Sequence, residues 1–133
     1  MSLQKPNKCI SIEEAKELEK NWCDTRQGAI DKCMTFEDSR EFWWSLEELQ
    51  EYLNYVREES NKQRIVNPGI RVYLGAYSKK KCKDGKGYST IFLSATGTPR
   101  ESFIDRGLPD LQNNERIAAY NGSHSGRPPS GLI

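Results

Sequence analysis

The sequence has few of the residues and motifs that mark catalytic or metal-binding proteins. Its 133 residues include one histidine and four cysteines, and no two cysteines form a C-x-x-C pair. A structural zinc site usually has paired ligands at short spacing. The phosphate-binding loop, the dinucleotide fingerprint, the H-E-x-x-H helix and the G-x-S-x-G elbow are also missing. We therefore predict no metal, no cofactor and no catalytic residues. Whether the protein is an enzyme stays open, and we favour a non-enzymatic role.

The sequence also lacks an excess of charge and a long hydrophobic run. Twenty Lys and Arg residues stand against nineteen Asp and Glu residues, for a formal charge of +1. Nucleic-acid-binding proteins are usually basic overall, so the balance argues against such a partner. No apolar run approaches the roughly 20 residues of a membrane-spanning helix, and the first residues lack the apolar stretch of a secretory signal. We expect a cytoplasmic protein with no membrane partner, and the oligomeric state is unknown.

The remaining composition is that of a folded domain. A chain of 133 residues with 35% hydrophobic residues is long enough to bury a core. We predict a single α+β domain over residues 1–133. Residues 1–10 form a loose N-terminal arm, and the Gly/Pro-rich stretch 121–133 is either a tail or a segment that covers the domain. The cysteines are interpreted as four reduced thiols, some of them buried, with one disulfide as the alternative in an exported protein.

Two segments have the pattern of amphipathic helices that begin with a capping box, in which a Ser and a Glu three residues later bind each other's backbone N–H groups. The first begins at Ser11, and its apolar spacing predicts a helix to about Arg26. Gly28 weakens any continuation, although Ile30 and Cys33 could extend the same stripe. The second begins at Ser45 and predicts a helix from Leu46 to about Lys62. We expect its buried stripe to consist of Leu46, Leu49, Leu53 and Val56, with Tyr52 and Tyr55 beside it.

A hairpin of two strands follows the second helix. Ile70, Val72, Leu74 and Ala76 alternate with more polar residues, and the segment from Ser89 to Ala95 alternates in the same way. Asn67-Pro68-Gly69 and Asp84-Gly85 are typical of turns. We predict two main helices packed on one face of a small antiparallel sheet, covering these apolar residues, with a loop-rich C-terminal third.

The other face of the hairpin is the leading candidate site. Arg71, Tyr73 and Tyr77 share it, and such residues bind planar or anionic ligands by stacking and charge-assisted hydrogen bonds. The alternative is that the C-terminal segment packs over this face, with the tyrosines as semi-buried cover. Arg26 either belongs to a capping charge pair or contributes to an anion site. We favour a binding or protein-interaction module whose partner is an unknown small molecule or protein.

Two other functions are weighed against this one. A small enzyme would gather Arg26, Arg71, Tyr73, Tyr77 and His124 around one pocket, and it requires His124 to lie close to Arg71. A nucleic-acid-associated protein would use a lysine-rich hairpin tip near two tyrosines. We rank the nucleic-acid function below the binding module and above the enzyme, because charge at a hairpin tip also protects a sheet from aggregation. The lysines concerned are Lys79, Lys80, Lys81, Lys83 and Lys86.

The order of these motifs resembles a group of small uncharacterised bacterial proteins of flavobacterial type. The resemblance covers nearly the whole chain and implies no activity. One departure is Ala95-Thr96, where the group would have Pro-Thr. The segments that carry the resemblance are Glu14–Leu18, Asn21-Trp22, Thr25-Arg26, Trp43–Leu49 with Tyr52 and Tyr55, Gly69–Tyr77, Thr90–Leu93 and Gly126–Pro129.

Overall fold

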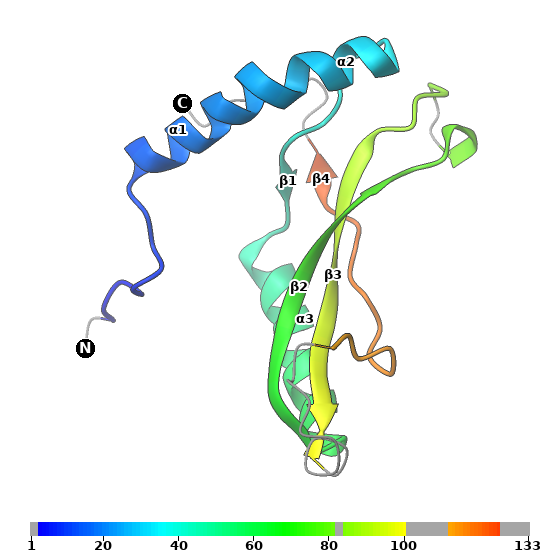
Figure 1. Ribbon diagram of the computed structural model, residues 1–133. Coiled ribbons are helices and arrows are strands. Elements are labelled where there is room, and N and C mark those ends of the chain that lie inside the picture. Colours follow the sequence, from blue (N-terminus) through cyan, green and yellow to red (C-terminus); the bar gives the residue numbers. More distant parts are fainter. Residues whose placement is uncertain (1–2, 82–83, 101–111, 126–133) are drawn as a thin grey trace.

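The computed structural model describes residues 3–81, 84–100 and 112–125 and has the predicted α+β class, with helices beside a small antiparallel sheet (Figure 1). Its elements in chain order are helix α1 (Ile12–Trp22), a π-helical turn (Cys23–Gln27), helix α2 (Gly28–Met34), strand β1 (Phe42–Trp43), helix α3 (Leu46–Lys62), strand β2 (Ile65–Ala76), a 3₁₀ turn (Lys79–Lys81), strand β3 (Ser89–Pro99) and strand β4 (His124–Ser125).

Strands β2 and β3 form a long antiparallel hairpin. Ile70 lies opposite Ala95, and the pairing continues to the start of β3. The hairpin extends beyond the predicted strands at its base, because Asn67-Pro68 is a bulge within β2 and not a turn. Asn67 takes a left-handed φ of 49° there, and asparagine tolerates this conformation better than most residues. A bulge also accommodates a proline, which cannot donate to the ladder.

The described part of the C-terminal segment adds to the other edge of β3. The backbones of Leu93 and Tyr120 exchange two hydrogen bonds, of 2.8 and 2.9 Å, and the Asn114 N–H donates to the Ala95 carbonyl at 2.9 Å. Farther along, β4 pairs with β1 in a second two-stranded sheet. Strand β3 is therefore flanked on both sides, whereas β2 lies at an edge among the described residues.

Helix α3 forms as predicted and supplies one half of the core. The hydroxyl of Ser45 accepts from the Glu48 N–H at 3.0 Å, and the Glu48 carboxylate accepts from the Ser45 N–H at 3.1 Å, which completes the capping box. The prediction was wrong for Leu46 and Leu53, which are 87% and 37% exposed, and Tyr52 lies in the core instead of beside it. The buried cluster consists of Tyr52, Val56, Leu93, Ala95 and Ile117.

The predicted burial of the apolar face of β2 holds only in part. Ile70 packs against the core, but Val72 is 60% exposed and Leu74 is 77% exposed. Both share a face with buried Leu93, since Val72 lies opposite Leu93 in the ladder. The C-terminal segment widens the sheet on the far side of β3, and the core of α3 gathers over β3 and Ile117. The outer strand is therefore left exposed at Val72 and Leu74.

The first helix is longer than predicted. Ser11 caps it as expected, with its hydroxyl accepting from the Glu14 N–H at 3.1 Å, but the helical run continues past Gly28 to Met34 through the π turn. Gly28 has ordinary helical dihedrals, φ −61° and ψ −40°. Figure 1 shows α1 extending away from the hairpin, and Leu18 on its apolar stripe is exposed.

The described residues hold three free cysteines, Cys9, Cys23 and Cys33, while Cys82 lies outside them. Cys9 and Cys33 are exposed, and Cys23 is partly buried. Within residues 3–81, 84–100 and 112–125, we find no helix with the length and apolar character needed to cross a membrane.

Candidate functional site

A cavity of about 340 Å³ lies between the N-terminal helical run and the hairpin. We call it the Trp22 pocket. One wall comes from the helical run, another from the segment before β1, and the third from the two hairpin strands. Its lining combines aromatic and aliphatic side chains with a few polar ones: Trp22, Gln27, Ile30, Asp38, Ser39, Arg40, Phe42, Leu74, Ser89 and Ile91. This composition is typical of small-molecule sites.

The π turn positions the first wall of this pocket. Trp22 and Gln27 are five residues apart, a spacing that in an α-helix puts them about 140° from each other around the axis. A π turn closes i to i+5 and brings these positions to one side. The Trp22 indole N–H donates to Gln27 Oε1 at 2.9 Å, and Gln27 Nε2 donates to Asp31 at 2.8 Å and to the Asp38 carbonyl at 3.0 Å. Buried Gln27 thus ties the helix to the next segment.

Asp38 joins that segment to the hairpin. Its carboxylate is buried and accepts from the Ser39 N–H at 2.9 Å and from the Ser89 N–H at 2.8 Å. The Ser89 hydroxyl donates to the second carboxylate oxygen. The Asp38 N–H in turn donates to the Asp31 carboxylate at 2.8 Å. Because both Asp38 oxygens already accept hydrogen bonds from the protein, this carboxylate holds the pocket together.

Two other residues of the lining, Ser39 and Arg40, carry polar groups. Ser39 is 6% exposed, and its hydroxyl has no hydrogen-bond partner among the described residues. Buried polar groups are nearly always hydrogen-bonded, so this hydroxyl indicates a missing partner. Arg40 forms an ion pair with Glu19, with Nε 3.4 Å from the carboxylate. A guanidinium has five N–H donors, so donors remain for an acceptor in the pocket.

The predicted tyrosine face is a different surface, and its polar groups bind the protein itself. The Tyr73 ring stacks on Phe92 with centroids 5.2 Å apart. Asn113 donates to the Tyr73 hydroxyl at 2.7 Å and accepts from Arg71 at 2.7 Å. The hydrogen bond from Asn113, followed by one from Arg71, lowers the pKa of Tyr73 below its usual value. Arg71 and Tyr73 therefore act as one cluster, closed by an amide from the C-terminal segment.

Tyr77 is bound in the same way. Its hydroxyl donates to Asn121 Oδ1 at 2.8 Å, and the Asn121 amide donates to the Ile91 carbonyl at 2.7 Å. The described C-terminal segment runs beside β3 and contacts the tyrosines with its amide side chains. This arrangement lies between the two sequence alternatives, an open face and a face under a covering segment.

The structure does not connect the other predicted residues with this face. Arg26 lies in the π turn, where its guanidinium donates to Thr25 at 2.8 Å. His124 lies in β4 and packs against Trp43, with ring centroids 5.5 Å apart. The contacts of these two side chains give no support to a shared pocket with Arg71, which the enzyme hypothesis requires.

The lysine hairpin is described in part. Lys79 and Lys80 are exposed in the 3₁₀ turn, and the Lys86 ammonium lies 5.7 Å from the centroid of the Phe36 ring. Lys81 ends the turn, and Lys83 lies outside the described residues. Asp84 accepts from the Lys86 N–H at 3.0 Å, as expected for the predicted turn. These positions leave the nucleic-acid hypothesis a prediction.

Sequence reasoning missed the Trp22 pocket as a site. Trp22 has the spacing of an ordinary core-facing residue of the first helix, and the segment that holds Asp38, Ser39 and Arg40 has no motif. The one available signal was an acidic residue followed by serine and arginine, just before the Phe42-Trp43-Trp44 run. Among the described residues, no group of three or more His, Cys, Asp or Glu side chains is arranged to hold a metal ion. No family model, curated protein or solved structure matches the chain.

Proposed function

We propose that this protein is a non-enzymatic binding protein that holds a small molecule in the Trp22 pocket. The observation that carries the proposal is the buried hydroxyl of Ser39, a residue of the pocket lining, which has no hydrogen-bond partner among the described residues. A buried hydroxyl left unpaired costs about 1–3 kcal/mol, and a ligand with a polar group would remove that cost.

The Trp22 pocket supports binding better than the tyrosine face does. A ligand on that face would have to displace Asn113 from Arg71 and Tyr73, at 2.7 Å each, and Asn121 from Tyr77. The loss of each of these hydrogen bonds would offset the gain from a new one to the ligand. In the Trp22 pocket, no hydrogen bond to the Ser39 hydroxyl has to be broken before a ligand binds. The volume of about 340 Å³ also lies within the usual range for ligand sites.

The residues that line the pocket favour one class of ligand. The Trp22 and Phe42 rings, together with aliphatic side chains, favour a flat, apolar body. The Ser39 hydroxyl and the Arg40 guanidinium favour one acceptor group on that body, such as a carboxylate. The Asp38 carboxylate has both oxygens bound by neutral donors of the protein, which leave its negative charge in place, so the Arg40 guanidinium has to supply the attraction for an anionic group. We therefore propose a small aromatic carboxylic acid as the ligand class.

The test uses 2-naphthoate as the probe and its neutral carboxamide as the comparison compound. We expect 2-naphthoate to raise the melting temperature of the full chain and to change tryptophan fluorescence. Arg40→Gln should weaken 2-naphthoate about tenfold, since one charge-assisted hydrogen bond contributes about 1.5 kcal/mol or more. The same variant should leave the affinity for the carboxamide nearly unchanged. Ile30→Trp should abolish binding of both compounds by filling the pocket.

Arg57→Gln is the matched control, because Arg57 lies on α3 in a separate groove. It should leave both affinities as in the wild type. The proposal is wrong if neither compound stabilises the wild-type chain. It is also wrong if binding persists unchanged in both Arg40→Gln and Ile30→Trp.

Two further parts of this proposal concern the protein's setting. We propose a cytoplasmic location, which free thiols at Cys9, Cys23 and Cys33 support, since a reducing compartment keeps cysteines unpaired. We also propose membership of the flavobacterial-type group on the order of its sequence motifs. Thiol titration of the protein isolated from its native cells would test the first, because an exported protein would hold fewer free thiols than the sequence has cysteines.

A further inference from the structure

We infer that the outer edge of β2 pairs with β2 of a second copy of this chain, which extends the sheet across a two-fold axis at Tyr73. The inference does not rest on ligand binding in the Trp22 pocket, although Leu74 belongs to both surfaces. It rests on three observations: a backbone ladder that no described strand pairs with, two exposed apolar side chains beside it, and a strand sequence that is complementary to itself.

The backbone hydrogen bonds of the hairpin show which groups of β2 face outward. The Tyr77 N–H donates to the Tyr88 carbonyl at 3.1 Å, so Tyr77 faces β3 with its backbone groups. Hydrogen-bonded positions alternate in an antiparallel ladder. Leu93 fits the same alternation. Val72 lies opposite it in the ladder, but the backbone groups of Leu93 form hydrogen bonds with Tyr120 on the other side of β3. The N–H and C=O groups of Ile70, Val72, Leu74 and Ala76 therefore point to the outer edge, where no described strand pairs with them.

The same edge is apolar. Val72 is 60% exposed and Leu74 is 77% exposed. A long, unprotected, apolar edge strand is an aggregation hazard that natural proteins normally blunt with charge, proline or cover. Here the proline lies in the bulge at the base of the strand, away from the stretch from Ile70 to Ala76. Cover by a partner strand would remove the hazard.

A second copy fits this edge because the strand is symmetric about Tyr73. In an antiparallel pair centred there, Val72 lies opposite the Leu74 position of the other copy, and Ile70 lies opposite the Ala76 position. These are the residues whose backbone groups point outward, so they would form the hydrogen-bonded pairs. Arg71, the one charge in the stretch, lies opposite the Gly75 position, so no like charges meet. A two-fold pairing of this kind closes as a dimer and does not propagate into a fibre.

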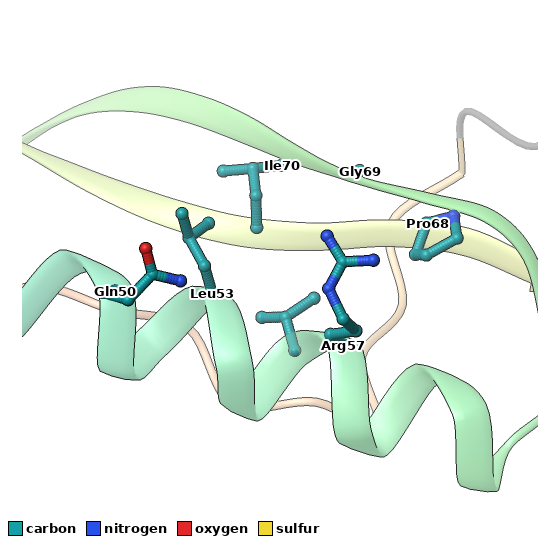
Figure 2. A pocket seen from close by; sticks show the side chains of 7 residues that line it. Gln50, Leu53, Arg57, Pro68, Gly69 and Ile70 are labelled. Carbon is teal, nitrogen blue, oxygen red and sulfur yellow. The ribbon is translucent and has the colours of Figure 1, made fainter. Parts of the chain in front are cut away.

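An open groove beside the edge provides additional contact surface. It has a volume of about 360 Å³ and lies between α3 and β2. Figure 2 shows Leu53 and Arg57 of α3 projecting toward the strand that carries Pro68 and Ile70. In the pairing centred at Tyr73, the far end of the second copy's β2 would lie next to Ile70 and close this side of the groove.

The test measures the mass of the full chain by sedimentation equilibrium over a wide range of concentrations. We expect a monomer–dimer equilibrium for the wild type. Val72→Glu and Leu74→Lys should each remain monomeric, because each places a charge opposite an apolar side chain. A mixture of the two variants should recover the dimer, since the new Glu and Lys then face each other in the proposed register. Leu46→Lys, at an 87% exposed apolar position on α3, is the matched control and should dimerise like the wild type.

Each outcome decides the inference. A wild type that stays monomeric throughout overturns it, as does a dimer that survives both Val72→Glu and Leu74→Lys. Two monomeric variants that fail to associate when mixed overturn the register centred on Tyr73. Circular dichroism verifies that the variants fold. If a charged variant does not fold, Val72→Thr and Leu74→Thr replace the pair, since threonine retains strand propensity, and both should lower the dimer fraction.

Discussion

Replacing Asp38 with alanine removes the acceptor that joins the segment before β1 to the start of β3. Three donors lose their partner: the Ser39 N–H, the Ser89 N–H and the Ser89 hydroxyl. Each unsatisfied buried N–H costs about 1–3 kcal/mol, while the hydroxyl is free to rotate toward another acceptor. We therefore expect Asp38→Ala to lower the free energy of unfolding by about 3–5 kcal/mol. That is a large part of the stability of an ordinary domain.

Urea unfolding followed by circular dichroism measures this change. With a slope of about 1–3 kcal/mol per molar urea, the midpoint should fall by roughly 2 M. Asp38→Asn retains one oxygen for the backbone donors and should cost less, about 1–2 kcal/mol. Hydrogen exchange adds a local measurement, because the amides of Ser39 and Ser89 should lose protection in Asp38→Ala.

Asp24→Ala is the control for the loss of an acidic side chain. Asp24 pairs with Lys20 on the exposed surface of the helical run, at 2.6 Å, and solvent screens such pairs. We expect no measurable change in its midpoint. The reasoning about Asp38 would be refuted if Asp38→Ala unfolded at the same urea concentration as Asp24→Ala, or if the Ser89 amide kept its protection.

Two further predictions concern the hairpin and the core. Gly97 has φ +132°, and a Cβ there would overlap Ile65 Cγ2, so Gly97→Ala should lower the free energy of unfolding by about 2–4 kcal/mol. Gly85→Ala, at φ +74° in open space, should cost only about 1–2 kcal/mol in the same urea titration, and equal costs would contradict this account. Burial, followed by the neighbouring Tyr55, raises the pKa of the Tyr52 hydroxyl. Its contribution to stability is present below the unfolded pKa of about 10 and is lost as pH rises through the higher folded pKa. Urea midpoints should therefore fall less steeply above pH ~10 in Tyr52→Phe than in the wild type, and parallel pH curves would show that Tyr52 has no such role.

The parts of the fold that the sequence predicted correctly depend on local interactions. The limits of α3 follow from Ser45 and Glu48, which bind each other's backbone within one turn. The alternation in β2 and β3 gave the right strands and the right pairing, because the period of two determines which side chains share a face. Neither property depends on the rest of the chain.

The burial of particular residues could not be predicted in this way. Val72 and Leu74 lie on the apolar face of the hairpin, as predicted. Whether that face is covered depends on where α3 and the C-terminal segment pack. The C-terminal segment pairs with the edge of β3 that faces away from β2, through Tyr120 and Asn114. The sequence around these two residues has no strand pattern. That pairing centres the core on β3 and leaves β2 outermost. Periodicity identifies an apolar surface and does not identify what contacts it.

The Trp22 pocket was beyond sequence reasoning for a more specific reason. The helical pattern of the first segment was read with a period of 3.6 residues, which separates Trp22 from Gln27 and suggests an end near Gly28. The π turn changes the period over Cys23–Gln27 only, aligns the two side chains and allows the helix to continue. π turns are rare and have no reliable sequence signature, yet they often occur at functional sites. The π turn, which helical periodicity did not predict, is thus the element that positions the first wall of the pocket. Straightening it into an α-helix would turn Gln27 away from Trp22 and remove the link to Asp38.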